Sequence, residues 1–132
     1  MNGKFIRSKD VERDQLDWGE MGWISHPPNT EAKHLTVIEV TLAPGGGHNF
    51  HKHTDQEEVI TVVSGEIEQW LETEKTTLKP GDSIFIHPDV IHASFNVSSK
   101  EAKLLVVLSP CVGESGYELV DVSHEIPWNT LR

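Results

Sequence analysis

The chain has 132 residues, of which 36% are hydrophobic and 24% charged, which is typical of one globular domain. Its 21 acidic residues against 11 basic ones give a formal net charge of -10, which disfavours nucleic acid and membrane partners. Cys111 is the only cysteine, which excludes an intrachain disulfide and fits a reducing compartment. Residues 1–14 lack the apolar core of a secretory signal and no stretch is long enough for a transmembrane helix, so we expect a cytoplasmic protein.

The first 33 residues differ from the remainder of the chain. They contain Trp18 and Trp23, mixed charges and the chain-breaking run His26-Pro27-Pro28-Asn29. No long helical period is present in this segment. We therefore expect residues 1–33 to form an N-terminal arm that packs on the main domain through its tryptophans.

From His34 onward, short runs rich in Val, Ile, Leu and Thr alternate with Gly, Pro, Asp and Ser. We expect strands over residues 35–43, 59–63, 66–71, 83–86, 90–97 and 103–109, with a further one over 117–122. Because no convincing helix separates these runs, the pattern favours an all-β sandwich or barrel. Residues 34–122 are expected to form this β-domain, and residues 123–132 a C-terminal tail.

A cluster of histidines indicates the chemistry. On a strand, side chains at positions i and i+2 point to the same face, so His51 and His53 project together and can hold one ion. The run Asp55-Gln56-Glu57-Glu58 follows with a carboxylate, and His92 on a later strand can complete the site from across the sheet. Imidazole and carboxylate together suit one divalent transition metal ion, namely Fe, Mn, Ni, Co or Zn. A His-x-His pair alone also occurs by chance on exposed strands, so the spacing of the whole set is decisive.

That spacing resembles the cupin family. Residues 45–65 read G-x5-H-x-H-x4-E-x6-G, which is the complete first cupin motif. The second motif, G-x5-P-x-G-x2-H-x3-N, is matched at Gly81, His92 and Asn96. The resemblance implies a double-stranded β-helix, which is a jelly-roll barrel.

The second motif departs from the family pattern at two positions. His87 stands where the motif has proline, and Asp89 stands where it has its second glycine. Aspartate tolerates left-handed backbone geometry better than most residues, so we expect the turn to be kept.

The resemblance implies a metal held by three histidines and one glutamate, which are His51, His53, Glu58 and His92 in this sequence. Glu58 is favoured over Glu57 because it stands at the family interval and shares strand parity with buried-type residues such as Ile60. Glu57 is then expected to face solvent or a neighbouring subunit.

Other polar residues near the motifs are candidates for supporting roles. His87, at a strand end near the mouth of the site, is either a base that assists the ligands or an exposed turn residue. Gln69 lies on a strand that can line the barrel, and Trp70 beside it is expected to serve in hydrophobic packing. His48 has the opposite parity to His51 and is expected to line the turn.

The known activities of small cupins include oxidation, decarboxylation, isomerisation and ligand binding, so the fold does not decide the reaction. Our first hypothesis is an enzyme, an oxidoreductase of the dioxygenase type that acts on a small oxygenated organic molecule. The alternatives are a metal-dependent isomerase or lyase of a small metabolite or sugar derivative, and a non-catalytic barrel that binds a small molecule. The resemblance further implies a homodimer, across which the N-terminal arm could exchange and cover a sheet edge.

Overall fold

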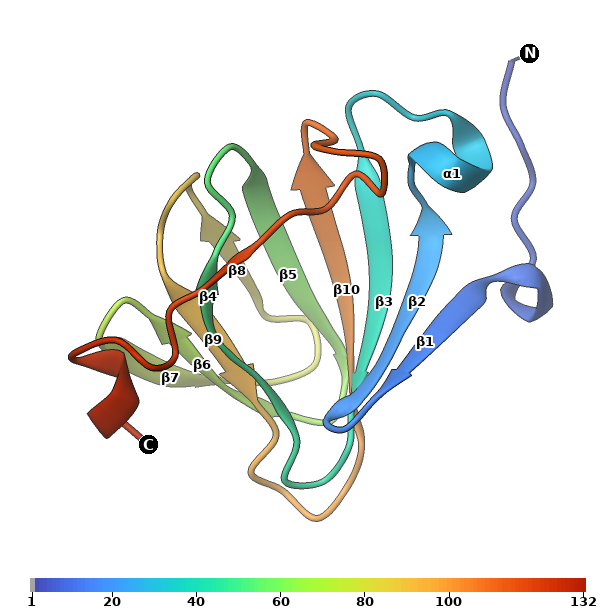
Figure 1. The fold of residues 1–132 in the computed structure, drawn as a ribbon. Coiled ribbons are helices and arrows are strands. Elements are labelled where there is room, and N and C mark those ends of the chain that lie inside the picture. The colour runs from blue at the N-terminus through green and yellow to red at the C-terminus, as the bar shows by residue number, and fades with distance from the viewer. Residues whose placement is uncertain (1) are drawn as a thin grey trace.

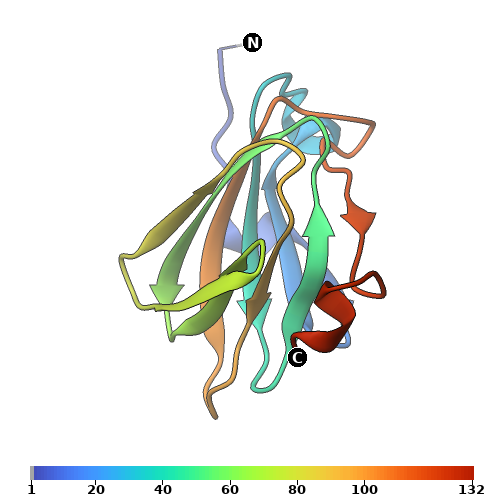
Figure 2. The same cartoon turned by 90° about the vertical axis from the view of Figure 1, so that its left-hand side faces the viewer.

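The computed structural model describes residues 2–132, and almost all of its regular structure is β-strand. Two antiparallel sheets face each other (Figures 1 and 2). The larger sheet has the strand order β1-β2-β3-β10-β5-β8, and the smaller has the order β11-β4-β9-β6-β7. The expected all-β fold is confirmed.

The strands are β1 (Glu12–Leu16), β2 (Gly19–Ser25), β3 (Thr36–Leu42), β4 (Gly47–Lys52), β5 (Glu57–Ser64), β6 (Ile67–Leu71), β7 (Glu74–Leu78), β8 (Ser83–Ile86), β9 (His92–Phe95), β10 (Ala102–Ser109) and β11 (Val120–Asp121). The helical segments are η1 (Ser8–Asp10), α1 (Pro27–Thr30) and η2 (Trp128–Thr130). No helix in residues 2–132 is long and apolar enough to span a membrane.

The larger sheet extends into the segment for which the sequence suggested an arm. β2 pairs with β3 and β1 pairs with β2, both antiparallel, so this N-terminal hairpin continues the sheet (Figure 1). Met21 on β2 is buried, and Trp18 and Trp23 pack against the same core. The hairpin was not apparent in the sequence because β1 is an edge strand with mostly exposed side chains, so it lacks apolar alternation.

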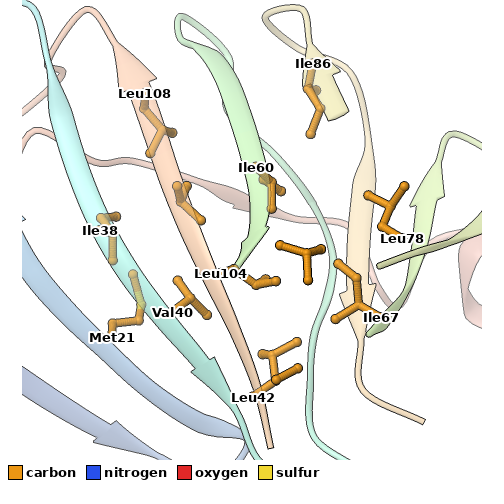
Figure 3. Packing of buried hydrophobic residues seen from close by; sticks show 13 residues of the cluster. Met21, Ile38, Val40, Leu42, Ile60, Ile67, Leu78, Ile86, Leu104 and Leu108 are labelled. Atoms are coloured by element: carbon orange, nitrogen blue, oxygen red, sulfur yellow. The ribbon is translucent and has the colours of Figure 1, made fainter. Parts of the chain in front are cut away.

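The main core lies between the two sheets and is built from alternate residues of each strand. On β3, for example, Ile38, Val40 and Leu42 are buried while the residues between them are half-buried. Side chains of β5, β8 and β10 extend this core, and Ile67 and Leu78 meet them from the smaller sheet (Figure 3). Each such side chain contributes about 1.5–3 kcal/mol by its removal from water.

A second apolar cluster holds the C-terminal tail on the outer face of the smaller sheet. Phe50, Trp70 and Phe95 form the centre of this cluster, and Trp128 and Leu131 of the tail pack against it. The Trp70 ring meets Phe50 edge to face at a centroid distance of 5.4 Å. Trp70 therefore serves in packing, as expected from the sequence.

The motif glycines stand where the backbone turns left-handed. Gly45, Gly65 and Gly81 have φ values of +78°, +75° and +95°. Asp89, at the motif's second glycine position, has a φ of +69°, so the turn is kept as expected. A Cβ atom at Gly65 would lie 2.8 Å from the Cα atom of Ala102, whereas one at Gly81 would meet no atom within 4 Å.

This difference yields a stability prediction. Gly81→Ala lowers the free energy of unfolding only through the left-handed backbone, by about 1–2 kcal/mol. Gly65→Ala loses the same amount and about 1–3 kcal/mol more through overpacking against β10. Denaturant unfolding of both variants is expected to show the larger loss of unfolding free energy for Gly65→Ala. Equal losses would contradict this assignment of the two turns.

Candidate metal centre

The motif side chains come together from both sheets. His51 lies on β4 and pairs directly with His92 on β9, and His53 follows the end of β4. The ligand nitrogens of these three histidines lie within 4.8 Å of one another. Glu58 reaches the same point from β5 of the larger sheet, so the centre joins the two sheets. All four side chains are at most 4% exposed.

Backbone carbonyls orient all three imidazoles. Nδ1 of His51 bonds to the carbonyl of Asn49 at 2.6 Å. Nδ1 of His53 bonds to the carbonyl of Glu118 at 2.8 Å, and Nδ1 of His92 to the carbonyl of Val90 at 3.0 Å. Because a carbonyl can only accept, each Nδ1 carries the proton and each Nε2 keeps its lone pair for a ligand.

The carboxylate of Glu58 completes a set of donor atoms that lack partners. Its Oε1 lies 2.8 Å from Nε2 of His92 and 3.4 Å from Nε2 of His53. All three of these atoms are nevertheless buried without a hydrogen bond. Such atoms are costly to bury, and a shared cation would satisfy all of them. The donor set therefore fits a divalent transition metal ion, which the three histidines could hold with Glu58 as the fourth ligand.

The surroundings of His51 and Glu58 favour the protonation states that bind metal, whereas the pKa of His92 is shifted toward the protonated form. Burial lowers the pKa of His51 well below its usual value, and the neighbouring histidines add to this effect, so its imidazole is neutral. Burial opposes ionisation of Glu58, but its contacts with His53 and His92 outweigh that and hold its pKa well below the usual range. Burial also opposes the charged form of His92, but the Glu58 carboxylate outweighs it and raises the pKa. Glu58 thus attracts positive charge to this point of the barrel.

The donor atoms lie on the wall of a cavity inside the barrel. Its interior has room for one or two water molecules, about 20 Å³, and the empty space that it shares with open solvent is about 380 Å³. Apolar side chains of β2, β3, β5 and β10 form most of the wall, and His48, Ser94 and Tyr117 add polar groups. No lysine or arginine of the described chain lines this cavity. Glu58 is its only acidic residue.

His48 reaches the cavity, so the parity argument that placed it at the turn is wrong. His48 pairs with Ser94 and His51 pairs with His92, which leaves one extra residue on β4. This bulge turns His48 and His51 to the same face. Their rings stack at a centroid distance of 3.8 Å, and Trp18 stacks on the far side of His48 at 5.1 Å. Burial lowers the pKa of His48 to about 4, so the ring is neutral near pH 7.

Residues 110–122, here called the strap, cross from β10 to the edge of the smaller sheet beside β4 (Figures 1 and 2). Gln56 fastens the strap, because its Nε2 donates to the carbonyls of Pro110 (2.7 Å) and Gly116 (2.9 Å). The strap also supplies the Glu118 carbonyl that orients His53, and it places Tyr117 on the cavity wall. Burial raises the pKa of Tyr117, and the Glu58 charge adds to this, so its hydroxyl keeps its proton. The sequence carried no local signal for Tyr117, because no motif spacing relates it to the histidines.

Of the remaining candidate residues, one supports the cavity wall and two are exposed. Gln69 is 2% exposed and accepts a hydrogen bond from Oγ of Ser94 at 2.6 Å, so it supports a residue of the cavity wall. His87 is exposed and packs against Phe85, away from the cavity. Glu57 is also exposed on the outer face of β5. Of the two adjacent glutamates, the structure therefore brings only Glu58 to the histidines.

The fold and this arrangement define a double-stranded β-helix barrel with a histidine-rich centre. The family described as "Cupin domain" matches residues 38–108, so the chain belongs to the cupin family. "Polyketide synthase CurC" from Streptomyces cyaneus is 26% identical over 121 residues, which is 92% of this chain and 79% of that protein.

Solved structures share the fold at low sequence identity. KdgF from Halomonas sp. superposes with a TM-score of 0.72 at 21% identity, over 81% of this chain and 94% of that one. A predicted oxalate decarboxylase from Thermotoga maritima superposes with a TM-score of 0.73 at 19% identity, over 81% and 99% of the two chains. These likenesses confirm the jelly-roll barrel implied by the motifs.

The adjacent glutamates provide a matched test of the metal centre. Glu58→Gln removes the carboxylate charge from the buried donor set, so metal affinity is expected to fall by at least about 10- to 100-fold. Glu57→Gln makes the same chemical change on the exposed face and is expected to leave the metal content unchanged. Elemental analysis of untagged protein, with competition by a chelator, measures both. Equal metal affinity in the two variants would contradict the choice of Glu58.

Proposed function

We propose that this protein is a mononuclear metal-dependent oxidoreductase of the dioxygenase type, which acts on a small oxygenated organic molecule. The observation that carries the proposal is the set of buried, unpartnered donor atoms of His53, Glu58 and His92 at the wall of a largely apolar cavity. Three imidazoles and one monodentate carboxylate would leave two positions of an octahedral ion, one for the substrate and one for dioxygen. A site built only for structure would have no need of open positions.

A bound redox-active ion such as iron would supply a Lewis-acidic centre at which the substrate and dioxygen meet. The reaction places both atoms of dioxygen in the products, and the substrate supplies the four electrons that dioxygen accepts, so no further reductant is required. His51, His53 and His92 would hold the ion as neutral ligands, while Glu58 would reduce the charge of the centre. The apolar wall excludes water from the reacting groups.

The cavity supports a substrate that is uncharged or carries a single negative charge. A divalent ion with one carboxylate ligand leaves one net positive charge, and no lysine or arginine of residues 2–132 lines the cavity to balance more. Burial of a dianion such as oxalate or a sugar phosphate would leave charge unpaired. The Streptomyces relative is named as a polyketide synthase, and polyketides are carbonyl-rich molecules of the kind this cavity favours.

A metal-dependent isomerase or lyase is the second candidate. It is favoured by the two protic side chains on the cavity wall, His48 and Tyr117, because such reactions move protons beside a polarised carbonyl. This candidate requires neither a redox-active ion nor dioxygen, which separates it from the first.

Oxygen uptake tests the proposal. The protein is loaded with Fe²⁺ or Zn²⁺ and supplied with uncharged diketones, hydroxyketones and dihydroxyaromatic compounds, with oxalate and a hexose phosphate as charged comparators. Uptake is expected only with iron and with members of the uncharged group, and it is expected to vanish in the His51→Ala/His92→Ala double variant.

Background uptake by iron-loaded protein over the whole panel would refute the dioxygenase proposal. Turnover of the same compounds by the zinc-loaded protein under argon would replace it with the isomerase or lyase. Exposed His87→Ala is the matched histidine control, and it is expected to retain both the metal and the uptake.

A further inference from the structure

The strap carries the only tyrosine of the chain to the cavity wall. The Tyr117 ring lies between two aromatic neighbours, with its centroid 5.1 Å from that of His53 and 5.7 Å from that of Trp23. The backbone carbonyl of Tyr117 accepts a hydrogen bond from Oγ of Ser115 at 3.0 Å. The Tyr117 hydroxyl, by contrast, has no hydrogen-bond partner among residues 2–132.

The backbone on both sides of Tyr117 is fixed. The carbonyl of Gly116 accepts bonds from Oγ1 of Thr36 (2.7 Å) and from Nε2 of Gln56 (2.9 Å). The carbonyl of Glu118 is bonded to Nδ1 of His53 at 2.8 Å. A Cβ atom at Gly116 would lie 2.6 Å from Cδ of Pro27, so only glycine fits beside the tyrosine. The position of the ring is thus determined from several sides, while its hydroxyl alone is left for an additional partner.

Tyr117 is half-buried, and a tyrosine hydroxyl that faces the interior of a protein usually has a hydrogen-bond partner. None of the other polar side chains on the cavity wall, which include His48, Glu58 and Ser94, makes a hydrogen bond to this hydroxyl. The hydroxyl is therefore free to bond to a molecule that enters the cavity. A phenol keeps its proton near neutral pH, so the Tyr117 hydroxyl can act as a donor.

We propose that Tyr117 is a substrate-binding residue, whose hydroxyl donates a hydrogen bond to an oxygen of a substrate held at the centre formed by His51, His53, Glu58 and His92. A neutral donor stabilises an uncharged or singly charged oxygen without a full positive charge in the cavity. Tyr117 thereby contributes to the choice of substrate as well as to its orientation. The inference rests on the proposed function only in requiring a metal-bound oxygen ligand, and it holds for either reaction class.

The test uses binding, with the full-length zinc-loaded protein and acetohydroxamic acid as the probe. This small uncharged molecule binds metal ions through two oxygens. Tyr117→Phe keeps the ring between Trp23 and His53 and removes only the hydroxyl. Calorimetric titration is expected to show a dissociation constant about 3- to 10-fold higher for Tyr117→Phe, the range of one neutral hydrogen bond. Its zinc content is expected to equal that of the parent.

Ser99→Ala is the matched control, because it removes an exposed hydroxyl away from the cavity wall and leaves the strap unchanged. Its dissociation constant is expected to match that of the parent. Since Tyr117 is the only tyrosine, fluorotyrosine labelling gives one ¹⁹F resonance for this position. That resonance is expected to shift when the probe is added to zinc-loaded protein.

Equal affinity of the parent and Tyr117→Phe for the probe would overturn the assignment. Loss of zinc from Tyr117→Phe would also overturn it, because the tyrosine would then act by supporting His53. Failure of the proposed function is distinguishable, since it is measured by oxygen uptake and leaves the binding comparison intact.

Discussion

The structure depends on the burial of one carboxylate inside an apolar barrel. Glu58 extends from β5 into the space between the sheets, where an unpaired charge costs several kcal/mol. A bound cation, or a proton on His92, offsets that cost where Oε1 of Glu58 meets Nε2 of His53 and of His92. Since these histidines belong to the opposite sheet, the need to neutralise Glu58 ties the two sheets together at one point. A bound cation meets this need better than a shared proton, because it also satisfies the third imidazole. The stability of the fold and the formation of the metal centre therefore depend on the same interaction, the neutralisation of Glu58.

The geometry of the centre comes from the backbone. Every imidazole is oriented through Nδ1 by a main-chain carbonyl, and two of these carbonyls lie two residues before the histidine that they hold. The third carbonyl, from Glu118, lies far along the chain on the strap. The orientation of His53 therefore depends on the position of the strap, and the hydrogen bonds of Gln56 hold the strap in that position. The strap connects the cavity wall, His53 and the edge of the smaller sheet. These three attachments explain why a segment with almost no regular structure is so extensively hydrogen-bonded.

Much of this arrangement was readable from the sequence, and the exceptions have physical causes. The ligand spacing, the left-handed turn at Asp89 and the choice of Glu58 over Glu57 follow from local geometry: period-two alternation and turn chemistry act over a few residues. His48 was misplaced because a bulge breaks that alternation between it and His51. Tyr117 carried no signal because its contact with His53 depends on the path of the strap, which no local pattern encodes. The N-terminal hairpin was hidden because an exposed edge strand such as β1 has no apolar face.

The net charge of the chain and the lining of the cavity both support the substrate class proposed above. A surface with a formal net charge of -10 slows the approach of multiply charged anions, and the cavity has no lysine or arginine, within the described chain, to receive one. The wall supplies neutral polar groups instead, from His48, Ser94 and Tyr117. A donor such as a phenol bonds a carbonyl or enolate oxygen without demanding the desolvation of a second full charge. The substrates proposed above, weakly charged carbon compounds that bear oxygen, are the ones that this set of metal ligands would suit together with a tyrosine on the cavity wall.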